Sequence, residues 1–221
     1  METLQAVLGF FAQLLNPNYL EQVLMTWGWL AYPFLFGVVF AETGLLIGFF
    51  FPGDSLLFVA GFVSSKDILS FPLLFVLLSV AAIVGDGVGY FLGKKAGPRV
   101  FTREDSLFFK KSHLRKTHDF YERHGGKTII LARFIPIIRT FAPFVAGMAD
   151  MTYMKFLSYN VFGGVGWVLS MTGAGYLLGN VPFIKRNFEA TVLVIVFVSA
   201  LPLFKEVLAA WWRHSRLTSA K

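Results

Sequence analysis

The segment "ILARFIPIIRTFAPFVAGM", residues 130–148, decides how this chain folds. It is almost wholly apolar, yet it contains Pro136 and Pro143 and carries Arg133 and Arg139 six residues apart. A proline removes a backbone donor and disrupts a regular helix. The segment is therefore too apolar for an exposed loop and too broken for a simple membrane-spanning helix.

The composition indicates that this segment lies in a membrane. The chain has 221 residues, of which 56% are hydrophobic and 17% aromatic, and this apolar share exceeds that of an ordinary soluble domain. The runs 70–92 and 190–204 have, or nearly have, the length that a helix needs to cross about 30 Å of hydrocarbon. We therefore predict an all-α polytopic membrane protein, and we expect no cleavable signal peptide because no Lys or Arg precedes the first apolar stretch.

Two sequence words recur at one spacing. "FVAG" occurs at 58–61 and at 144–147, an offset of 86 residues. At the same offset, "GYFLG" at 89–93 corresponds to "GYLLG" at 175–179. Identities in register predict an internal repeat. Within a single domain of 1–221, we assign repeat 1 to about 27–93, a basic linker to 94–127, repeat 2 to about 128–179 and a C-terminal helix and tail to 180–221.

The positive charges predict the topology. Ten of the twenty Lys and Arg residues lie in 94–127 and four more lie in the C-terminal tail, so the net charge of +7 reflects the positive-inside rule rather than nucleic-acid binding. Residues 106–126 predict an amphipathic helix on the cytoplasmic membrane surface. If both basic segments are cytoplasmic, the chain between them crosses an even number of times.

An even number of crossings leaves 128–148 as a re-entrant hairpin and inverts repeat 2 relative to repeat 1. By the same logic, residues 43–63 form a second re-entrant hairpin, broken at "FFFPGD". We expect the breaks in the two hairpins at Pro52 and Gly53 and at Pro136 and Pro143. Broken backbone is tolerated at membrane depth where protein or a water-filled cavity surrounds it.

Five ionisable residues lie within apolar stretches: Glu42, Asp54 and Asp86 in repeat 1, and Arg133 and Arg139 in repeat 2. Each costs at least about 2.5 kcal/mol at mid-depth unless it has a partner or water. Acids and arginines either pair only to hold the hairpins together, or they form a transport site. In a transport site the arginine forks suit phosphate, and Glu42 and Asp54 suit proton carriage. Asp86 is expected to give support by bonding to backbone near its flanking glycines.

Four sequence segments resemble the bacterial DedA family: "FPGDSLLFVAG", "GDGVGYFLG", "HGGKTIILARFIPIIRTFAPFVAGM" and "YNVFGGVGW". The resemblance is strong from about residue 42 to 167 and looser outside. It implies an inner-membrane protein with two re-entrant loops and with membrane-embedded charges at Glu42, Asp54, Arg133 and Arg139. It also implies dependence on the proton-motive force and transfer of undecaprenyl phosphate, the lipid carrier of cell-wall synthesis, across the membrane. Related eukaryotic VTT-domain proteins are lipid scramblases, so the resemblance does not fix the substrate.

These observations together predict a proton-driven flippase for undecaprenyl phosphate in the bacterial inner membrane, with a cytoplasmic C-terminus. Its expected partners are membrane lipids and protons, without cofactor, metal or nucleic acid, and a homo-oligomer stays open. The alternatives are a proton-coupled antiporter of small ions or drugs, whose cations two arginines would repel, and a structural or assembly factor. An enzyme is disfavoured, because the Ser-Gly-His signature of membrane lipid phosphatases and the Gly-x-Ser-x-Gly and HExxH motifs are missing from the sequence.

Overall fold

The computed structural model describes residues 17–46, 53–101 and 128–182, apart from 131 and 134, and a few single positions between 184 and 194. Its named elements are α2 (Pro17–Trp27), the 3-10 turn η1 (Gly28–Leu30), α3 (Ala31–Gly44), α4 (Gly53–Ser64), α5 (Phe71–Phe101), α7 (Pro136–Met148) and α8 (Tyr153–Leu178). This described part contains helices and no strand. The all-α prediction is confirmed.

Three helical stretches are long and apolar enough to cross a membrane: Asn18–Gly44, Phe71–Gly97 and Tyr153–Leu178. The first of them is not one straight helix. Gly28 has a φ of 52°, a left-handed conformation that glycine adopts without steric cost, and η1 separates α2 from α3 there. The predicted C-terminal helix and the amphipathic helix at 106–126 lie largely or wholly outside the described residues.

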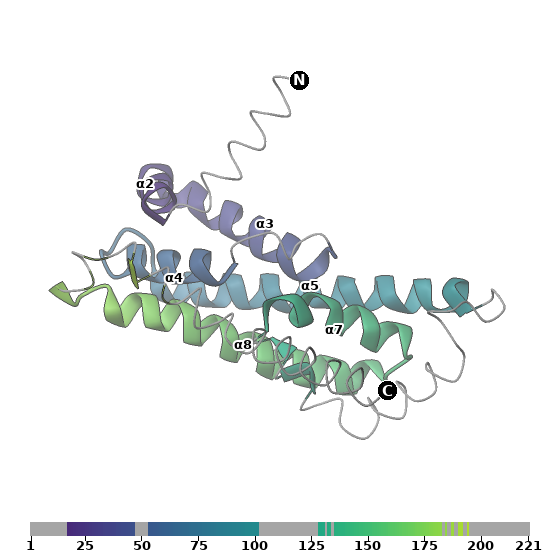
Figure 1. Cartoon of the computed structure of the whole chain (residues 1–221). Coiled ribbons are helices and arrows are strands. Elements are labelled where there is room, and N and C mark those ends of the chain that lie inside the picture. Colours follow the sequence, from purple (N-terminus) through teal and green to yellow (C-terminus); the bar gives the residue numbers. More distant parts are fainter. Residues whose placement is uncertain are drawn as a thin grey trace, which may run out of the picture.

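The two long helices, α5 and α8, run in opposite directions (Figure 1). Phe71 at the start of α5 lies 4.8 Å, between ring centroids, from Tyr176 at the end of α8. Tyr90, farther along α5, lies 4.7 Å from Phe156 near the start of α8. An inverted repeat predicts this antiparallel arrangement of equivalent helices. Helix α5 continues to Phe101, past residue 93, where repeat 1 was expected to end.

Helices α3 and α4 form the first helical hairpin beside α5 (Figure 1). The backbone amide of Ser70, just before α5, donates to the Tyr32 hydroxyl at the start of α3. The other end of α3, at Gly44, lies against Gly85 in the middle of α5. The first arm of this hairpin is therefore all of α3, which begins well before the predicted residue 43. Whether either hairpin re-enters a bilayer stays a prediction.

The hairpin helices pack against the long helices through glycines. Helix α4 packs mainly on α8, and α7 packs mainly on α5. A Cβ atom at any of four glycines would overlap a backbone carbonyl oxygen of the partner helix: Gly61 with Thr172, Gly175 with Phe58, Gly147 with Tyr90, and Gly93 with Phe144. Small residues that let helix backbones touch are typical of membrane interfaces. Each repeat thus contributes one short helix to the long helix of the other.

The register of these crossings differs from the register of the sequence words. Gly93 of α5 lies against Phe144 of α7, and Gly175 of α8 lies against the equivalent residue of α4, Phe58. These two glycines are 175 − 93 = 82 residues apart, whereas the repeated words are 86 residues apart. The difference of four residues is about one helical turn. Packing has therefore shifted one long helix by a turn relative to the sequence alignment.

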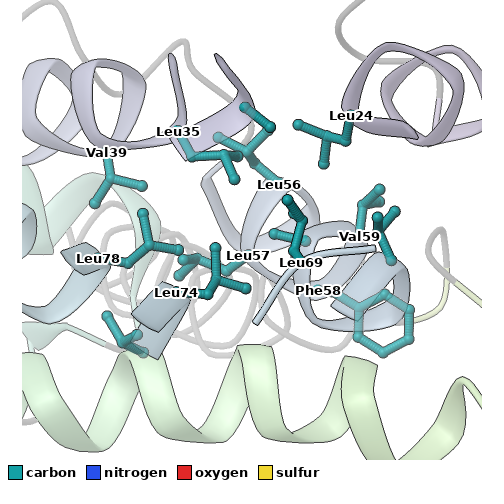
Figure 2. Close-up of a cluster of buried hydrophobic side chains, with 14 of the residues drawn as sticks. Leu24, Leu35, Val39, Leu56, Leu57, Phe58, Val59, Leu69, Leu74 and Leu78 are labelled. Atoms are coloured by element: carbon teal, nitrogen blue, oxygen red, sulfur yellow. The ribbon is translucent and has the colours of Figure 1, made fainter. Parts of the chain in front are cut away.

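Helix α4 lies in the centre of an apolar cluster. Figure 2 shows Leu56, Leu57 and Phe58 of α4 among leucines and valines of α2, α3 and α5. Every residue of α4 is buried, as expected for a helix that is apolar all round. The cluster fixes the position of Asp54, which lies in the first turn of this helix.

The predicted hairpin breaks have different outcomes. Gly53 is the first residue of α4 and Pro136 is the first residue of α7, a position where a helix tolerates proline. Pro143 does not interrupt the helix, because α7 continues through it to Met148. The proline removes one helical hydrogen bond, and it packs close to Gly89 of α5. Pro52 lies outside the described residues.

Candidate functional site

The five ionisable residues singled out in the sequence are all buried. Their exposed fractions are 0% for Glu42, 7% for Asp54, 3% for Asp86, 3% for Arg133 and 7% for Arg139. They come from α3, α4, α5, the turn before α7, and α7, in that order. The site thus collects charged side chains from both hairpins and from a long helix.

Arg139 lies between two carboxylates of the first hairpin. Its Nη2 donates to Glu42 Oε1, and its Nη1 donates to Asp54 Oδ1 at 2.5 Å. The indole Nε1 of Trp167, on α8, donates to the same Asp54 oxygen at 2.8 Å. The Arg139 Cζ atom lies 4.8 Å from the Trp167 ring centroid, within cation–π range. We call Glu42, Asp54, Arg139 and Trp167 the Arg139 cluster.

Local structure explains how the two acids reach Arg139. Asp54 lies in the first turn of α4, where the helix dipole favours a negative charge. A Cβ atom at Gly53 would overlap the Glu42 carboxylate. Glycine at this position therefore lets the end of α3 approach the start of α4 closely enough for both acids to share one guanidinium.

Arg133 has a different set of partners. Its Nη2 donates to Asp86 Oδ2 on α5 and to Asn160 Oδ1 on α8. The Asn160 Nδ2 donates to the Ile83 carbonyl oxygen at 3.0 Å. Asp86 was expected to support backbone near its glycines, but it pairs with Arg133 instead, because the turn before α7 brings that arginine against α5. We call Asp86, Arg133 and Asn160 the Arg133 cluster.

Two glycines let α8 approach Arg133. A Cβ atom at Gly163 would lie 3.0 Å from the Arg133 Cδ, and one at Gly164 would lie 3.3 Å from its Cζ. Asn160, Gly163, Gly164 and Trp167 occupy positions i, i+3, i+4 and i+7 of α8, which share one helical face. None of these four residues was predicted to have a function from the sequence. Their spacing within "YNVFGGVGW" is the signal that could have found this face.

The site carries a surplus of acid. Three carboxylates and two guanidiniums give a net charge of −1 if all are ionised, and an uncompensated buried charge is strongly unfavourable. The surplus acid belongs to the Arg139 cluster. Glu42 Oε2 and the Nε atoms of Arg133 and Arg139 have no hydrogen-bond partner among the residues that the structure describes. Chemically, the arrangement can hold a proton on a carboxyl group and still offer guanidinium donors to an anion.

The chain is similar to known membrane proteins. Residues 51–177 match the VTT domain family. The chain is 48% identical to "Protein DedA" of Escherichia coli K12 over 200 residues, which cover 90% of each chain. It is 44% identical to an uncharacterized membrane protein of Mycobacterium leprae over 79% of this chain and 77% of that one. It is 34% identical to "Inner membrane protein YqjA" of E. coli K12 over 88% and 85% of the two chains. No solved structure was found to match the chain.

The fold and the match over 51–177 define a multi-pass membrane protein with a VTT domain. With its 48% identity over nine-tenths of a DedA protein, the chain belongs to the DedA family. The resemblance on the four sequence segments is confirmed at the level of the family.

Proposed function

We propose that this chain is a proton-driven transporter of a polyprenyl phosphate, most simply undecaprenyl phosphate, in the bacterial inner membrane. The observation that carries the proposal is the sharing of Arg139 by Glu42 and Asp54 in a buried site with one surplus acid. A relative that is 34% identical over 88% of this chain is named an inner membrane protein, which supports the location. The cytoplasmic C-terminus is part of the proposal.

Carboxylate and phosphate oxygens accept the same guanidinium hydrogen bonds. When Glu42 and Asp54 take up protons, their attraction for Arg139 weakens and its donors become available to a phosphate. When the acids lose their protons, they bind Arg139 again and the phosphate is released. A phosphate monoester carries about −1.5 to −2 charges at neutral pH, so uptake of two protons, one on Glu42 and one on Asp54, offsets the charge that the phosphate brings.

Arg133 would be the second ligand of the phosphate. Each arginine has a buried Nε–H without a partner in the described part of the chain, and an unmade buried hydrogen bond costs about 1–3 kcal/mol. Phosphate oxygens would satisfy both donors. The apolar tail would lie outside the site, along surfaces that carry exposed apolar side chains such as Phe162 and Leu177. We propose transport and not catalysis.

The competing function is purely structural, with ion pairs that hold the hairpins together. The pairing of both Arg133 and Arg139 with acids favours this structural role. Against it, a buried salt bridge adds little stability compared with a well-packed apolar pair, and a structural pair needs no surplus carboxylate. The surplus acid also suits a small cation, but the two guanidiniums would repel it.

The test is a leaflet assay with purified protein in liposomes that carry fluorescent undecaprenyl phosphate. The expected result is movement between leaflets that a pH gradient accelerates and that Glu42→Gln and Asp54→Asn slow. Glu21→Gln is the matched control, because Glu21 pairs with Lys66 away from the site. Equal movement in liposomes with and without protein would refute lipid transport. Loss of both site variants from the membrane, with full activity in the surviving molecules, would favour the structural role.

A further inference from the structure

One face of α8 contacts both clusters. Asn160, Gly163 and Gly164 lie against Arg133. One to two turns farther along the same face, Trp167 contacts Arg139 and Asp54. Asn160 is fully buried and Trp167 is 1% exposed, so neither side chain faces lipid. A single rigid element therefore touches both arginines of the site.

We propose that Asn160 and Trp167 are positioning residues of the transport site, and that this face of α8 links the Arg133 and Arg139 clusters. The inference rests on the proposed function and deepens it. It assigns to α8 the task of keeping the guanidiniums in place while their acceptors change from carboxylate to phosphate.

The Asn160 amide is fixed from both sides. Its Nδ2 donates to the Ile83 carbonyl, one turn before Asp86 on α5, so its Oδ1 must face Arg133. This oxygen keeps one bond to Nη2 when Asp86 is no longer the acceptor. A neutral amide is suited to this task, because a carboxylate in its place would compete with the phosphate for the guanidinium.

Trp167 holds the side chains of the Arg139 cluster in place. Its indole N–H is a donor only, and it donates to the same Asp54 oxygen, Oδ1, that accepts from Arg139. The indole ring lies over the Arg139 guanidinium. Asp54 and Arg139 thus keep a fixed contact with α8 when the bond between them breaks. Near Trp167, the other charged group is Glu42 of α3. Near Asn160, the charged groups are Asp86 of α5 and Arg133.

The first test measures binding of a short-chain polyprenyl phosphate to the purified full chain, with melting temperature measured in parallel. Asn160→Ala and Trp167→Phe are expected to bind on the order of tenfold more weakly, the loss of one hydrogen bond to a charged group. Asn160→Asp should bind more weakly still, because a second carboxylate competes with the phosphate for Arg133. It should also melt at a lower temperature, because it adds a buried charge and leaves the Ile83 carbonyl oxygen without its donor. Ser158→Ala, an exposed polar deletion on the same helix, is the control.

A purely structural role would lower the melting temperature without changing the affinity of the folded molecules. A weaker affinity in Asn160→Ala and Trp167→Phe, measured at a temperature where both variants are folded, therefore separates the two roles. Wild-type binding by both Asn160→Ala and Trp167→Phe would overturn the inference. No binding by the wild type would instead overturn the proposed function. The link between the two clusters through α8 is then tested by a second measurement, which needs no lipid.

The second test follows the fluorescence of Trp167 against pH, in a protein whose other tryptophans are changed to phenylalanine. The replaced residues are Trp27, Trp29, Trp211 and Trp212. We expect a pH response that disappears in Asp54→Asn and whose midpoint moves in Asn160→Ala, although Asn160 lies in the other cluster. A response that Asn160→Ala leaves unchanged, or no response at all, would overturn the link through α8.

Discussion

The Arg133 and Arg139 clusters use the same residue type in different electrostatic settings. Arg139 is shared by two carboxylates, through Nη1 and Nη2, and it lies against an indole. Among the residues that the structure describes, Arg133 donates through Nη2 to one carboxylate and one neutral amide. The first cluster has a surplus acid and the second is balanced. Under the proposed function, this difference assigns proton exchange to the Arg139 cluster, whereas the Arg133 cluster anchors the turn before α7 to α5 and α8.

The largest expected effect comes from removal of Arg139. Arg139→Gln leaves two buried carboxylates without a cation and should destabilise the fold by about 3–5 kcal/mol. Addition of Glu42→Gln and Asp54→Asn should restore most of this loss, because the uncompensated charges are then gone. The free energy of unfolding in detergent measures both steps. If Asp86→Asn restores Arg139→Gln equally well, the two clusters are not separate.

Neutralising an acid should cost more stability in the Arg133 cluster than in the Arg139 cluster. Asp86→Asn leaves Arg133 without its balancing charge and should cost about 3 kcal/mol, at the low end for a broken buried pair. Glu42→Gln removes the surplus charge and should cost about 1 kcal/mol or less, since Asp54 still balances Arg139. Unfolding of the two single variants, measured side by side, checks this order. The reverse order would place the surplus acid in the Arg133 cluster.

Arginine-to-lysine variants compare the geometry of the two guanidiniums. Arg139→Lys should weaken binding of a polyprenyl phosphate by about 1–3 kcal/mol, because an ammonium cannot present two parallel donors. Arg133→Lys should cost less, since the two bonds from Arg133 to described residues come from one nitrogen. Binding to purified protein, with folding checked by melting temperature, measures the difference. Full affinity in the double lysine variant would exclude fork recognition of phosphate.

The smallest expected effect concerns the glycine beneath Glu42. Gly53→Ala should destabilise the fold by on the order of 1 kcal/mol, because its Cβ would displace a carboxylate that is the end of a flexible side chain. Gly87→Ala on α5 is the matched control, since a Cβ there has no heavy atom within 4 Å, and alanine is the better helix former. Thermal unfolding of both variants provides the test. Equal destabilisation would mean that the Glu42 contact is not specific.

The sequence alone was sufficient for the coarse architecture. Apolar length predicted the long helix α5, and the words repeated at an offset of 86 predicted an equivalent helix in repeat 2, which is α8. The cost of charge in hydrocarbon was enough to single out the five ionisable residues, all of which are buried.

The pairing within the site could not be predicted, because it depends on contacts between distant segments. Asp86 and Arg133 are 47 residues apart, and the shift of one turn between the two glycine crossings changes which residues of α5 face the second hairpin. Asn160 and Trp167 carry no charge, so the cost of ionised groups in a membrane did not reveal them. Only the packing of α8 against both hairpins shows their contacts.

The four glycines at the helix crossings have a consequence for permeation. Where backbone touches backbone, as at Gly61 on Thr172 and Gly147 on Tyr90, no side chain can swing aside to open a gap. The crossings seal each hairpin helix against the long helix behind it, so neither a water file nor an acyl chain can pass along these two seams. In the proposed transport, a proton or a head group would therefore reach the buried arginines by a route other than these two seams, and a substitution that widens a seam would produce a leak.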